Sequence, residues 1–180
     1  PSNCRSSPLR SRGDVGDRGS GQPALEPLVD YTKEGAGDYY LLPKRTGKAQ
    51  LVDPYFYALG GKQVLITSLV QPVMRAGRFV GIAGVDIALD ALQKELGAIR
   101  PLGVGHVALY AGSGLVVSHP ESSLLGKPAS LPGDVASALK EGRPLRWADK
   151  EGMVNFLVPI RIEGLDAHWG TVVSVPDAAI

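Results

Sequence analysis

The chain has 180 residues, 44% of them hydrophobic, and 19 basic against 18 acidic residues give a formal net charge of +1 at pH 7. This length allows one large domain or two small ones with an ordinary globular core. The near-neutral charge argues against a nucleic-acid surface. The single cysteine, Cys4, excludes an internal disulfide, and no apolar run reaches the length of a membrane-spanning helix.

Residues 1–23 are predicted to be a disordered tail. Leu9 and Val15 are its only large aliphatic residues, and Ser, Gly, Arg and Asp make up most of the rest. Such a segment cannot bury enough apolar surface to offset the entropy that it loses on ordering. The folded part of the chain is therefore expected to begin at residue 24.

Aromatic residues gather in the next stretch. After a loop at Gly35–Asp38, the pair Tyr39-Tyr40 leads into Pro43, which is expected to stop the segment. Leu51–Tyr57 is predicted to be a short strand, and Pro54 places it at a sheet edge or a bulge because proline has no backbone N–H. Clustered tyrosines occur in cores and also as walls of pockets for small polar or cationic ligands, and both alternatives stay open.

The centre of the chain predicts a hairpin of two apolar strands, Gln63–Val73 and Arg78–Ile87. Gly77, in the polar break between them, is expected to take a positive φ. Asp86 would end a buried strand, where a carboxylate is costly unless it is paired, so a backbone cap, an arginine or a cationic ligand is expected there. A helix over Ala88–Leu96 follows.

The second half predicts another α+β unit after a joint at Gly97–Gly105. Val104–Tyr110 and Leu115–His119 form a hairpin around a Gly-Ser-Gly turn, and Leu131–Glu141 forms a helix that Gly142 ends. Three further strands are predicted: Leu145–Ala148, Gly152–Ile162 and His168–Val175.

A weak internal repeat relates the two halves. Pro72 matches Pro159, and Gly81 matches Gly170, within similar strand–turn–strand segments. The repeat predicts two copies of one small antiparallel-sheet module, joined by the central helix.

No catalytic constellation stands out. The three histidines lack metal-ligand spacing, and His119 before Pro120 is expected to cap a turn. Ser113 lies in a turn without the GxSxG pattern. We therefore expect no enzyme activity, no cofactor and no metal, and the tyrosine group with Asp86 is the best candidate site.

Four runs follow one another along the chain: Gly37-Asp-Tyr-Tyr-Leu-Leu-Pro-Lys, Asp53-Pro-Tyr, Val64-Leu-Ile-Thr-Ser-Leu-Val-Gln-Pro-Val and Gly81-Ile-Ala-Gly-Val-Asp-Ile-Ala-Leu. In this order they resemble the double-Cache sensor domain of bacterial methyl-accepting chemotaxis receptors. A further run, Gly112-Ser-Gly-Leu-Val-Val-Ser-His-Pro, is similar to the opening hairpin of its membrane-proximal module, and the resemblance covers about residues 24–176.

The resemblance implies an α/β (α+β) fold of two PAS-like antiparallel-sheet Cache modules. The membrane-distal module would be N-terminally truncated and span residues 24–88, residues 89–101 would be the connecting helix and joint, and residues 102–176 would form the membrane-proximal module. It also implies an extracytoplasmic, periplasmic location, with the anchoring helices outside this chain.

The resemblance further implies a ligand site in the distal module. Carried over by position, the ligand-binding residues are Tyr39, Tyr40, Tyr55 and Asp86, with Asp86 as the aspartate that binds a ligand amino group. Tyr57 is counted with them, although it stands where the family carries a second aspartate. Gly37 stands where amino-acid-sensing members carry a carboxylate-binding arginine, so a ligand carboxylate has no evident partner.

The expected function is an extracytoplasmic, small-molecule-binding sensor domain of a chemotaxis receptor that signals across the membrane. The expected partners are a small-molecule ligand, with an amine-bearing one as the candidate, and no nucleic acid; a homodimer is a possible assembly. The alternatives are the sensor domain of a histidine kinase or cyclase, and a ligand-free structural or dimerisation Cache module.

Overall fold

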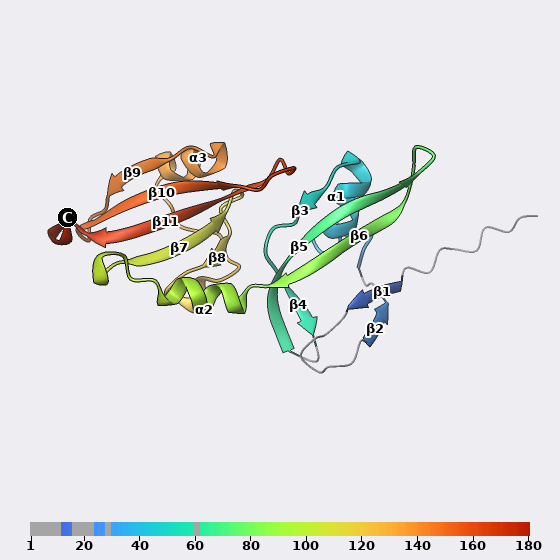
Figure 1. Cartoon of the computed structure of the whole chain (residues 1–180), viewed down its shortest axis with the longest axis horizontal. Coiled ribbons are helices and arrows are strands. Elements are labelled where there is room, and N and C mark those ends of the chain that lie inside the picture. The colour runs from blue at the N-terminus through green and yellow to red at the C-terminus, as the bar shows by residue number, and fades with distance from the viewer. Residues whose placement is uncertain (1–11, 16–23, 28–29, 60–61) are drawn as a thin grey trace, which may run out of the picture.

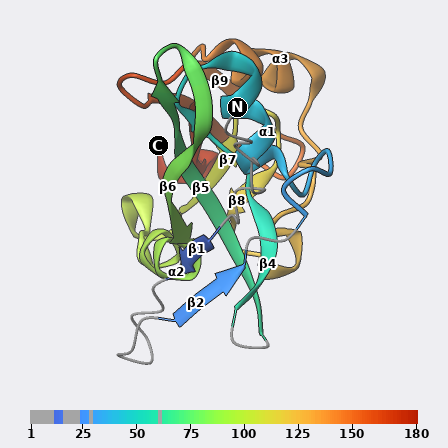
Figure 2. The same ribbon diagram turned by 90° about the vertical axis from the view of Figure 1, so that its right-hand side faces the viewer.

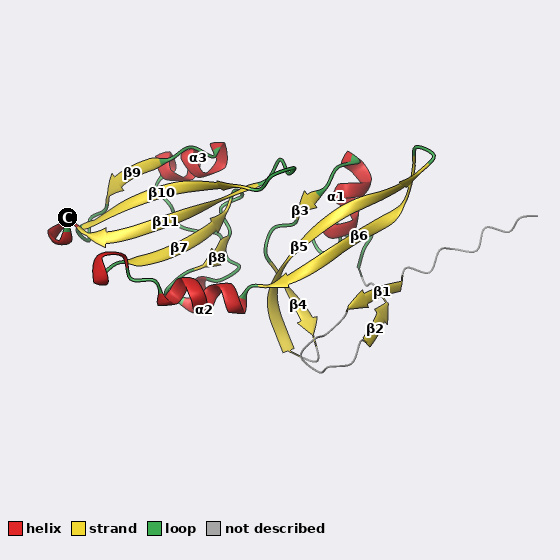
Figure 3. Cartoon of the chain, in the orientation of Figure 1, coloured by secondary structure: helices red, strands yellow, loops and turns green. Residues whose placement is uncertain are grey.

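Two main antiparallel sheets lie one after the other along the long axis of the molecule, as the computed structural model shows (Figure 1). The structure describes residues 12–15, 24–27, 30–59 and 62–180. Strands dominate the regular structure, and the helices are few and short (Figure 3). The predicted α+β fold with two antiparallel sheets is therefore confirmed. In this described part, no helix is long and apolar enough to cross a membrane.

The first sheet is built around the long strand β5 (Lys62–Arg75). Strand β6 (Arg78–Ala88) pairs along one edge of β5, and β3 (Gln50–Leu51) and β4 (Tyr55–Leu59) pair along the opposite edge. Ala76 and Gly77 both have positive φ, of 49° and 74°, in the turn that joins β5 to β6. Such a two-residue turn matches the twist of a tight hairpin, and the predicted conformation of Gly77 is confirmed.

The second sheet contains five strands in the order β8-β7-β11-β10-β9, all paired antiparallel. The strands are β7 (His106–Ala111), β8 (Val116–Ser118), β9 (Leu145–Ala148), β10 (Met153–Arg161) and β11 (His168–Pro176). All five strands lie where the sequence predicts them. Short 3-10 turns at Pro101–Gly103, Ser122–Leu124 and Asp177–Ala179 complete this half of the chain.

Helices α2 (Asp90–Ala98) and α3 (Gly133–Glu141) pack on the second sheet. Ala138 and Leu139 of α3 share a buried cluster with Leu157, and Leu92 and Leu96 of α2 pack on a cluster that contains Leu109. Side chains alternate between the faces of a strand, so both faces of this sheet carry apolar residues. Gly142 ends α3 with a φ of 63°, as predicted.

Among the described residues, the contacts that join the sheets include a buried apolar one and an exposed polar one. Leu65 of β5 and Leu89, which is only 2% exposed and directly precedes α2, share a buried cluster with Leu109 of β7. At another point, Lys48 forms an ion pair with Asp166 in the loop between β10 and β11. The two sheets are therefore linked through a buried apolar contact and an exposed polar one.

The prediction that residues 1–23 form a disordered tail is wrong for residues 12–15. Strand β1 (Arg12–Val15) pairs antiparallel with β2 (Ala24–Pro27), near the β4 end of the first sheet (Figure 1 and Figure 2). Strand pairing uses backbone N–H and C=O groups, which every segment carries, so few apolar side chains do not prevent it. Residues 1–11 and 16–23 lie outside the described residues.

Two further predictions for the aromatic stretch are wrong. Pro43 does not stop the segment but lies inside helix α1 (Asp38–Thr46). Proline removes only one backbone donor from a helix. The C-terminal turn still closes, because the Gly47 N–H donates to the Pro43 carbonyl. The single strand predicted over Leu51–Tyr57 is divided into β3 and β4, with buried Pro54 in the break.

The predicted repeat appears as two long hairpins, β5–β6 and β10–β11. Pro159 pairs with Gly170, but Pro72 pairs with Ile82, one position from the matched Gly81. The pairing of β5 with β6 shifts by one residue between Val73 and Met74. This shift accounts for the one-residue difference in register between the two hairpins, which cannot be read from the sequence repeat.

Candidate functional site

The candidate site lies on one face of the first sheet, here called the site face. Ser68 of β5 pairs directly with Asp86 of β6, and Tyr55 of β4 pairs with Ile66, two residues before Ser68. Because side chains two apart share a face, Tyr55, Tyr57, Ser68 and Asp86 all belong to the site face. Three strands thus bring three of the predicted residues together.

A directed chain of hydrogen bonds joins these residues. The Ser68 hydroxyl donates to Asp86 Oδ1 at 2.5 Å, and the Tyr55 and Ser68 hydroxyl oxygens are 2.7 Å apart. A serine hydroxyl has one hydrogen, so with that hydrogen on Asp86 the Tyr55 hydroxyl must be the donor to Ser68. The chain runs from Tyr55 through Ser68 to Asp86 and requires Asp86 to accept, as an ionised carboxylate does.

Tyr39 of α1 faces the same group from the helix, which lies against β5 and β6. Burial raises the pKa of the Tyr39 phenol to about 12. That value includes the smaller effects of neighbouring acidic groups, which are Tyr55, Tyr57, Asp30 and Asp86. Burial also raises the pKa of Tyr55, although its hydrogen bond with Ser68 acts in the opposite direction. These tyrosines therefore stay protonated at neutral pH.

Tyr40 belongs to a separate aromatic group. Its ring packs edge to face against Tyr31 and Phe79, with centroid distances of 5.3 and 5.4 Å. Lys44 Nζ lies over the same ring, 5.5 Å from its centroid. These contacts hold α1 to β6. The structure therefore gives Tyr40 packing contacts with Tyr31, Phe79 and Lys44, and groups it apart from the other four predicted residues.

Asp86 does not end a buried strand, so that expectation is wrong. None of the eleven residues of β6 is buried, and Asp86 is exposed. Its partner Ser68 is 0% exposed and sits in the strongly buried middle of β5. The carboxylate is thus fixed from the protein side by a buried hydroxyl and open to solvent on the other, which suits a group that meets a ligand.

Sequence reasoning missed Ser68 as a site residue. Ser68 is a polar residue within the apolar run of β5, and this was the available signal. Only the register of β5 with β6 shows that Ser68 pairs with Asp86. Sequence reasoning also missed Phe79 and Tyr31, which hold Tyr40. The described residues contain no group of three or more His, Cys, Asp or Glu side chains that could hold a metal ion.

The second sheet carries a polar group at the matching position, but that group is closed. Asn155 lies four residues before Pro159 as Ser68 lies four before Pro72, and it pairs with Ser174. Ser174 donates to Asn155 Oδ1 at 2.5 Å, and Asn155 Nδ2 donates to Asp149 Oδ2 at 2.9 Å. Both Asn155 and Ser174 are buried, so these groups satisfy one another within the protein.

Two hollows border the first sheet. A pocket of about 340 Å³ lies at the start of α1 and the β3–β4 connection, and Asp38, Asp53 and Tyr55 are among its lining residues. A cleft of about 640 Å³ lies between the sheets, lined by residues that include Leu69 and Val85 on one side and residues 162–165 on the other. Leu69 and Val85 pair with each other on the face opposite Asp86, so the cleft and the site are distinct.

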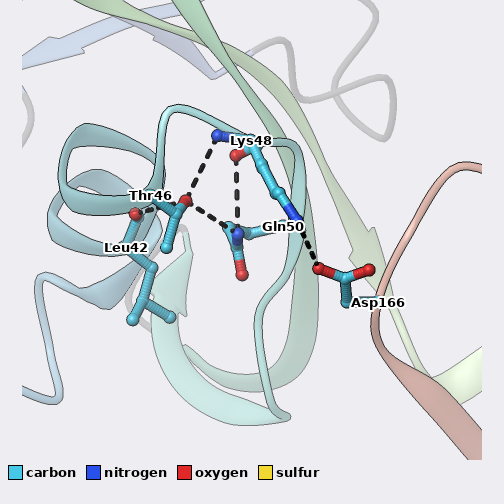
Figure 4. A network of polar contacts seen from close by, with 5 residues as sticks. All are labelled: Leu42, Thr46, Lys48, Gln50 and Asp166. Carbon is cyan, nitrogen blue, oxygen red and sulfur yellow. Dashed lines mark hydrogen bonds and ion pairs between the residues drawn. The ribbon is translucent and has the colours of Figure 1, made fainter.

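A polar network connects the end of α1 to the cleft (Figure 4). The Thr46 hydroxyl donates to the Leu42 carbonyl at 2.9 Å and accepts from the backbone of Lys48 at 3.2 Å. Lys48 Nζ then donates to Asp166 at 3.0 Å. Helix α1, which presents Tyr39 to the site face, is therefore linked through its C-terminal turn to the β10–β11 loop.

Residues 17–94 match the family described as methyl-accepting chemotaxis protein-like, first PDC sensor domain. Over 152 residues, the chain is 30% identical to the methyl-accepting chemotaxis protein TlpQ of Pseudomonas aeruginosa, covering 79% of this chain and 21% of TlpQ. The chain thus spans about a seventh to a fifth of the length of the curated relatives that it matches.

Solved structures of sensor domains share the fold. A structure named methyl-accepting chemotaxis protein X superposes with a TM-score of 0.70 at 31% identity, over 86% of this chain and 59% of that one. The extracellular domain of the histidine kinase candidate mmHK1S-Z2 gives a TM-score of 0.73 at 28% identity, over 88% and 60%. Residues 17–94 thus match a PDC sensor domain, and the chain is homologous to the ligand-binding domains of Pseudomonas chemotaxis receptors, consistent with a Cache-type sensor.

Proposed function

We propose that this chain binds a small molecule on the site face and forms part of the extracytoplasmic sensor of a membrane-anchored chemotaxis receptor. The first sheet with α1 would be the membrane-distal module, residues 89–101 the connection, and residues 102–176 the membrane-proximal module. Ligand binding would alter the position of α1 and be passed through the second sheet to a membrane helix after Pro176. A homodimer is the proposed assembly.

The observation that carries the proposal is the Tyr55–Ser68–Asp86 hydrogen-bond chain on the site face. It holds an exposed, ionised carboxylate in one position beside protonated tyrosines, which is an arrangement suited to a positively charged group. A charge-assisted hydrogen bond to Asp86 would contribute roughly 1.5–3 kcal/mol. Tyrosine rings would add about 0.5–2 kcal/mol each. Asp86 is therefore the proposed anchor, with Tyr39, Tyr55 and Tyr57 as the wall and Tyr40 as their support.

Two alternatives use the same fold differently. The likeness to mmHK1S-Z2 favours a histidine kinase as the output, and a cyclase is a further candidate. A ligand-free structural or dimerisation module would need no open polar group, whereas Asp86 is exposed and fixed. We therefore place binding ahead of a purely structural role, and no catalytic step is proposed.

A thermal-shift screen tests the proposal, with amines, amino acids and organic acids as the panel. We expect at least one compound to raise the melting temperature and Asp86→Asn to weaken its binding about tenfold or more, which is about 1.4 kcal/mol. Asp177→Asn, an exposed aspartate near the C-terminus, is the control and should leave affinity unchanged. Equal effects of the two substitutions, or no stabilising compound, would reject the site.

A further inference from the structure

We infer that His119 is a proton-responsive residue at the contact between the two halves of the chain. When its imidazole takes up a proton, the loop of residues 119–126, here called the His119 loop, loosens from the first sheet. The inference goes beyond the proposed function, because it involves no residue of the site face and needs no ligand.

Helix α2 holds the backbone of His119. Gln93 Nε2 donates to the His119 carbonyl oxygen at 2.6 Å, and the His119 N–H donates to Gln93 Oε1 at 3.0 Å. One side-chain amide thus satisfies both backbone groups of His119, as a neighbouring strand would. The position of His119 is therefore fixed relative to α2, the helix that follows β6 of the first sheet in the chain.

The imidazole of His119 closes the turn at the start of the loop. Its Nδ1 atom accepts the Glu121 N–H at 3.0 Å, so the prediction that His119 caps a turn is confirmed. A ring nitrogen accepts a hydrogen bond only when it carries no hydrogen, so this bond requires the neutral imidazole with its hydrogen on Nε2. A protonated ring carries a hydrogen on both nitrogens. Protonation would therefore remove the bond and set the Nδ1–H against the Glu121 N–H.

The His119 loop also packs on the first sheet. Leu125 packs on the buried cluster that contains Leu65 of β5. At Gly126, which has a φ of 71°, a Cβ atom would lie 3.0 Å from Leu65 Cδ1 and 3.0 Å from Phe56 Cε2 of β4. The loop approaches β4 and β5 so closely that a shift of its backbone changes the apolar contact between the two halves.

Two titratable groups act on the His119 ring. They are Glu121, in the loop itself, and His106, at the start of β7. Helix α2 presents the uncharged Gln93 to His119. Its charged residues are exposed and, in the described part of the chain, form no hydrogen bond or ion pair with His119; they are Asp90, Lys94 and Glu95.

The neutral form of His119 is favoured in the folded chain. Burial lowers the pKa of His119 below its ordinary value of 6.5, the charge of His106 acts in the same direction, and the Glu121 carboxylate acts in the opposite one. Because folding lowers this pKa, the stabilisation from the neutral ring is fully present above 6.5 and is lost as the pH falls through the folded-state pKa. The loop is therefore expected to be closed at neutral pH and to loosen in mild acid.

Nuclear magnetic resonance of the 180-residue chain, titrated from about pH 7.5 to about pH 5, tests the inference. The imidazole nitrogen shifts report the tautomer and the protonation of His119. Amide hydrogen exchange, corrected for the intrinsic effect of pH, reports the protection of the loop. We expect the Nε2–H tautomer at neutral pH. We also expect residues 121–126 to lose protection about tenfold or more, with the same midpoint as the titration of His119.

His119→Asn is the decisive variant, because an asparagine oxygen can accept the N–H two residues on in the same kind of turn but takes up no proton. It should keep the loop protected at both ends of the pH range. His119→Ala removes the acceptor and should leave the loop unprotected at both ends. His106→Asn is the control and should keep the pH-dependent loss.

Three results would overturn the inference. They are a native loop that stays protected after His119 is protonated, a pH-dependent loss that persists in His119→Asn, and a loss that disappears in His106→Asn. Each of these results would leave the proposed function standing, because none of them involves ligand binding on the site face.

Discussion

Lys48 Nζ lies 3.0 Å from the carboxylate of Asp166, and this pair joins the residue after the α1 turn to the loop between β10 and β11. The two side chains are 66% and 87% exposed, so the pair contributes at most about 1 kcal/mol to stability. Its position gives it another role, because it links the helix that carries Tyr39 to the second sheet beside the cleft.

Reversing one charge of this pair should loosen the β10–β11 loop without unfolding the protein. For Lys48→Glu we expect faster amide hydrogen exchange at Ile162–Leu165 and a free energy of unfolding within about 1 kcal/mol of the native value. Lys48→Glu with Asp166→Lys should restore the slower exchange. Lys127→Glu, an exposed lysine elsewhere, is the control, and the same acceleration in that variant would contradict the link.

Removing the Ser68 hydroxyl should destabilise the first sheet. Ser68→Ala leaves the Tyr55 hydroxyl and Asp86 without their shared partner, so we expect a loss of about 1–3 kcal/mol in urea unfolding. Tyr55→Phe should lower the free energy of unfolding less in the Ser68→Ala background than in the native protein, because the two residues share one hydrogen bond. Ser113→Ala, in an exposed turn, should change stability by less than about 0.5 kcal/mol. If the two substitutions lower the free energy of unfolding additively, the Tyr55–Ser68–Asp86 hydrogen bonds do not act as a unit.

Substitution by alanine should destabilise the protein at one glycine of the repeat and not at the other. A Cβ atom on Gly170 would clash with the Leu139 and Leu157 side chains, so Gly170→Ala should cost about 1–3 kcal/mol. Nothing lies within 4 Å of a Cβ on Gly81, so Gly81→Ala should cost nothing measurable. Thermal unfolding of both variants is the measurement, and equal losses would argue against close packing of α3 on the second sheet.

Asp149 should make stability depend on acid pH. Hydrogen bonds from Asn155 and then from the Met153 backbone lower the pKa of Asp149 below its ordinary value of 3.8. A carboxyl whose pKa is depressed by folding stabilises the protein above the ordinary pKa, and that stability is lost as the pH falls through the folded-state pKa. Asp149→Asn should therefore lower the free energy of unfolding at neutral pH. It should also make that free energy depend less on pH in the acid range. Unfolding measured at a series of pH values from neutral downward checks both results. An unchanged acid slope would contradict this account.

Much of the fold could be predicted from sequence because strand and helix signals are local. The runs of Val, Ile and Leu gave β5, β6 and the strands of the second sheet, and Gly77 and Gly142 take the positive φ that their turns require. Helix α1 could not be predicted in the same way, since Pro43 signals a stop and only the surrounding contacts tolerate it.

The arrangement of the site was less predictable. Residue type and family resemblance identified Tyr39, Tyr55 and Asp86 as candidates. Whether their side chains lie on the same face of the sheet depends on the register of β5 with β6. A slip of one residue would turn Asp86 to the opposite face, and the register is set by the Ala76–Gly77 turn together with the shift at Val73/Met74. The strand composition contains neither fact, so Ser68 could not be identified as the partner of Asp86.

A crystal structure of the chain with its best-binding amine tests the central claim most directly. The account predicts density for the ligand on the site face, with the ammonium nitrogen about 2.7–2.9 Å from an Asp86 carboxylate oxygen and tyrosine side chains around it. Ligand density in the cleft beside Leu69 and Val85, with the Asp86 carboxylate uncontacted, would contradict the account.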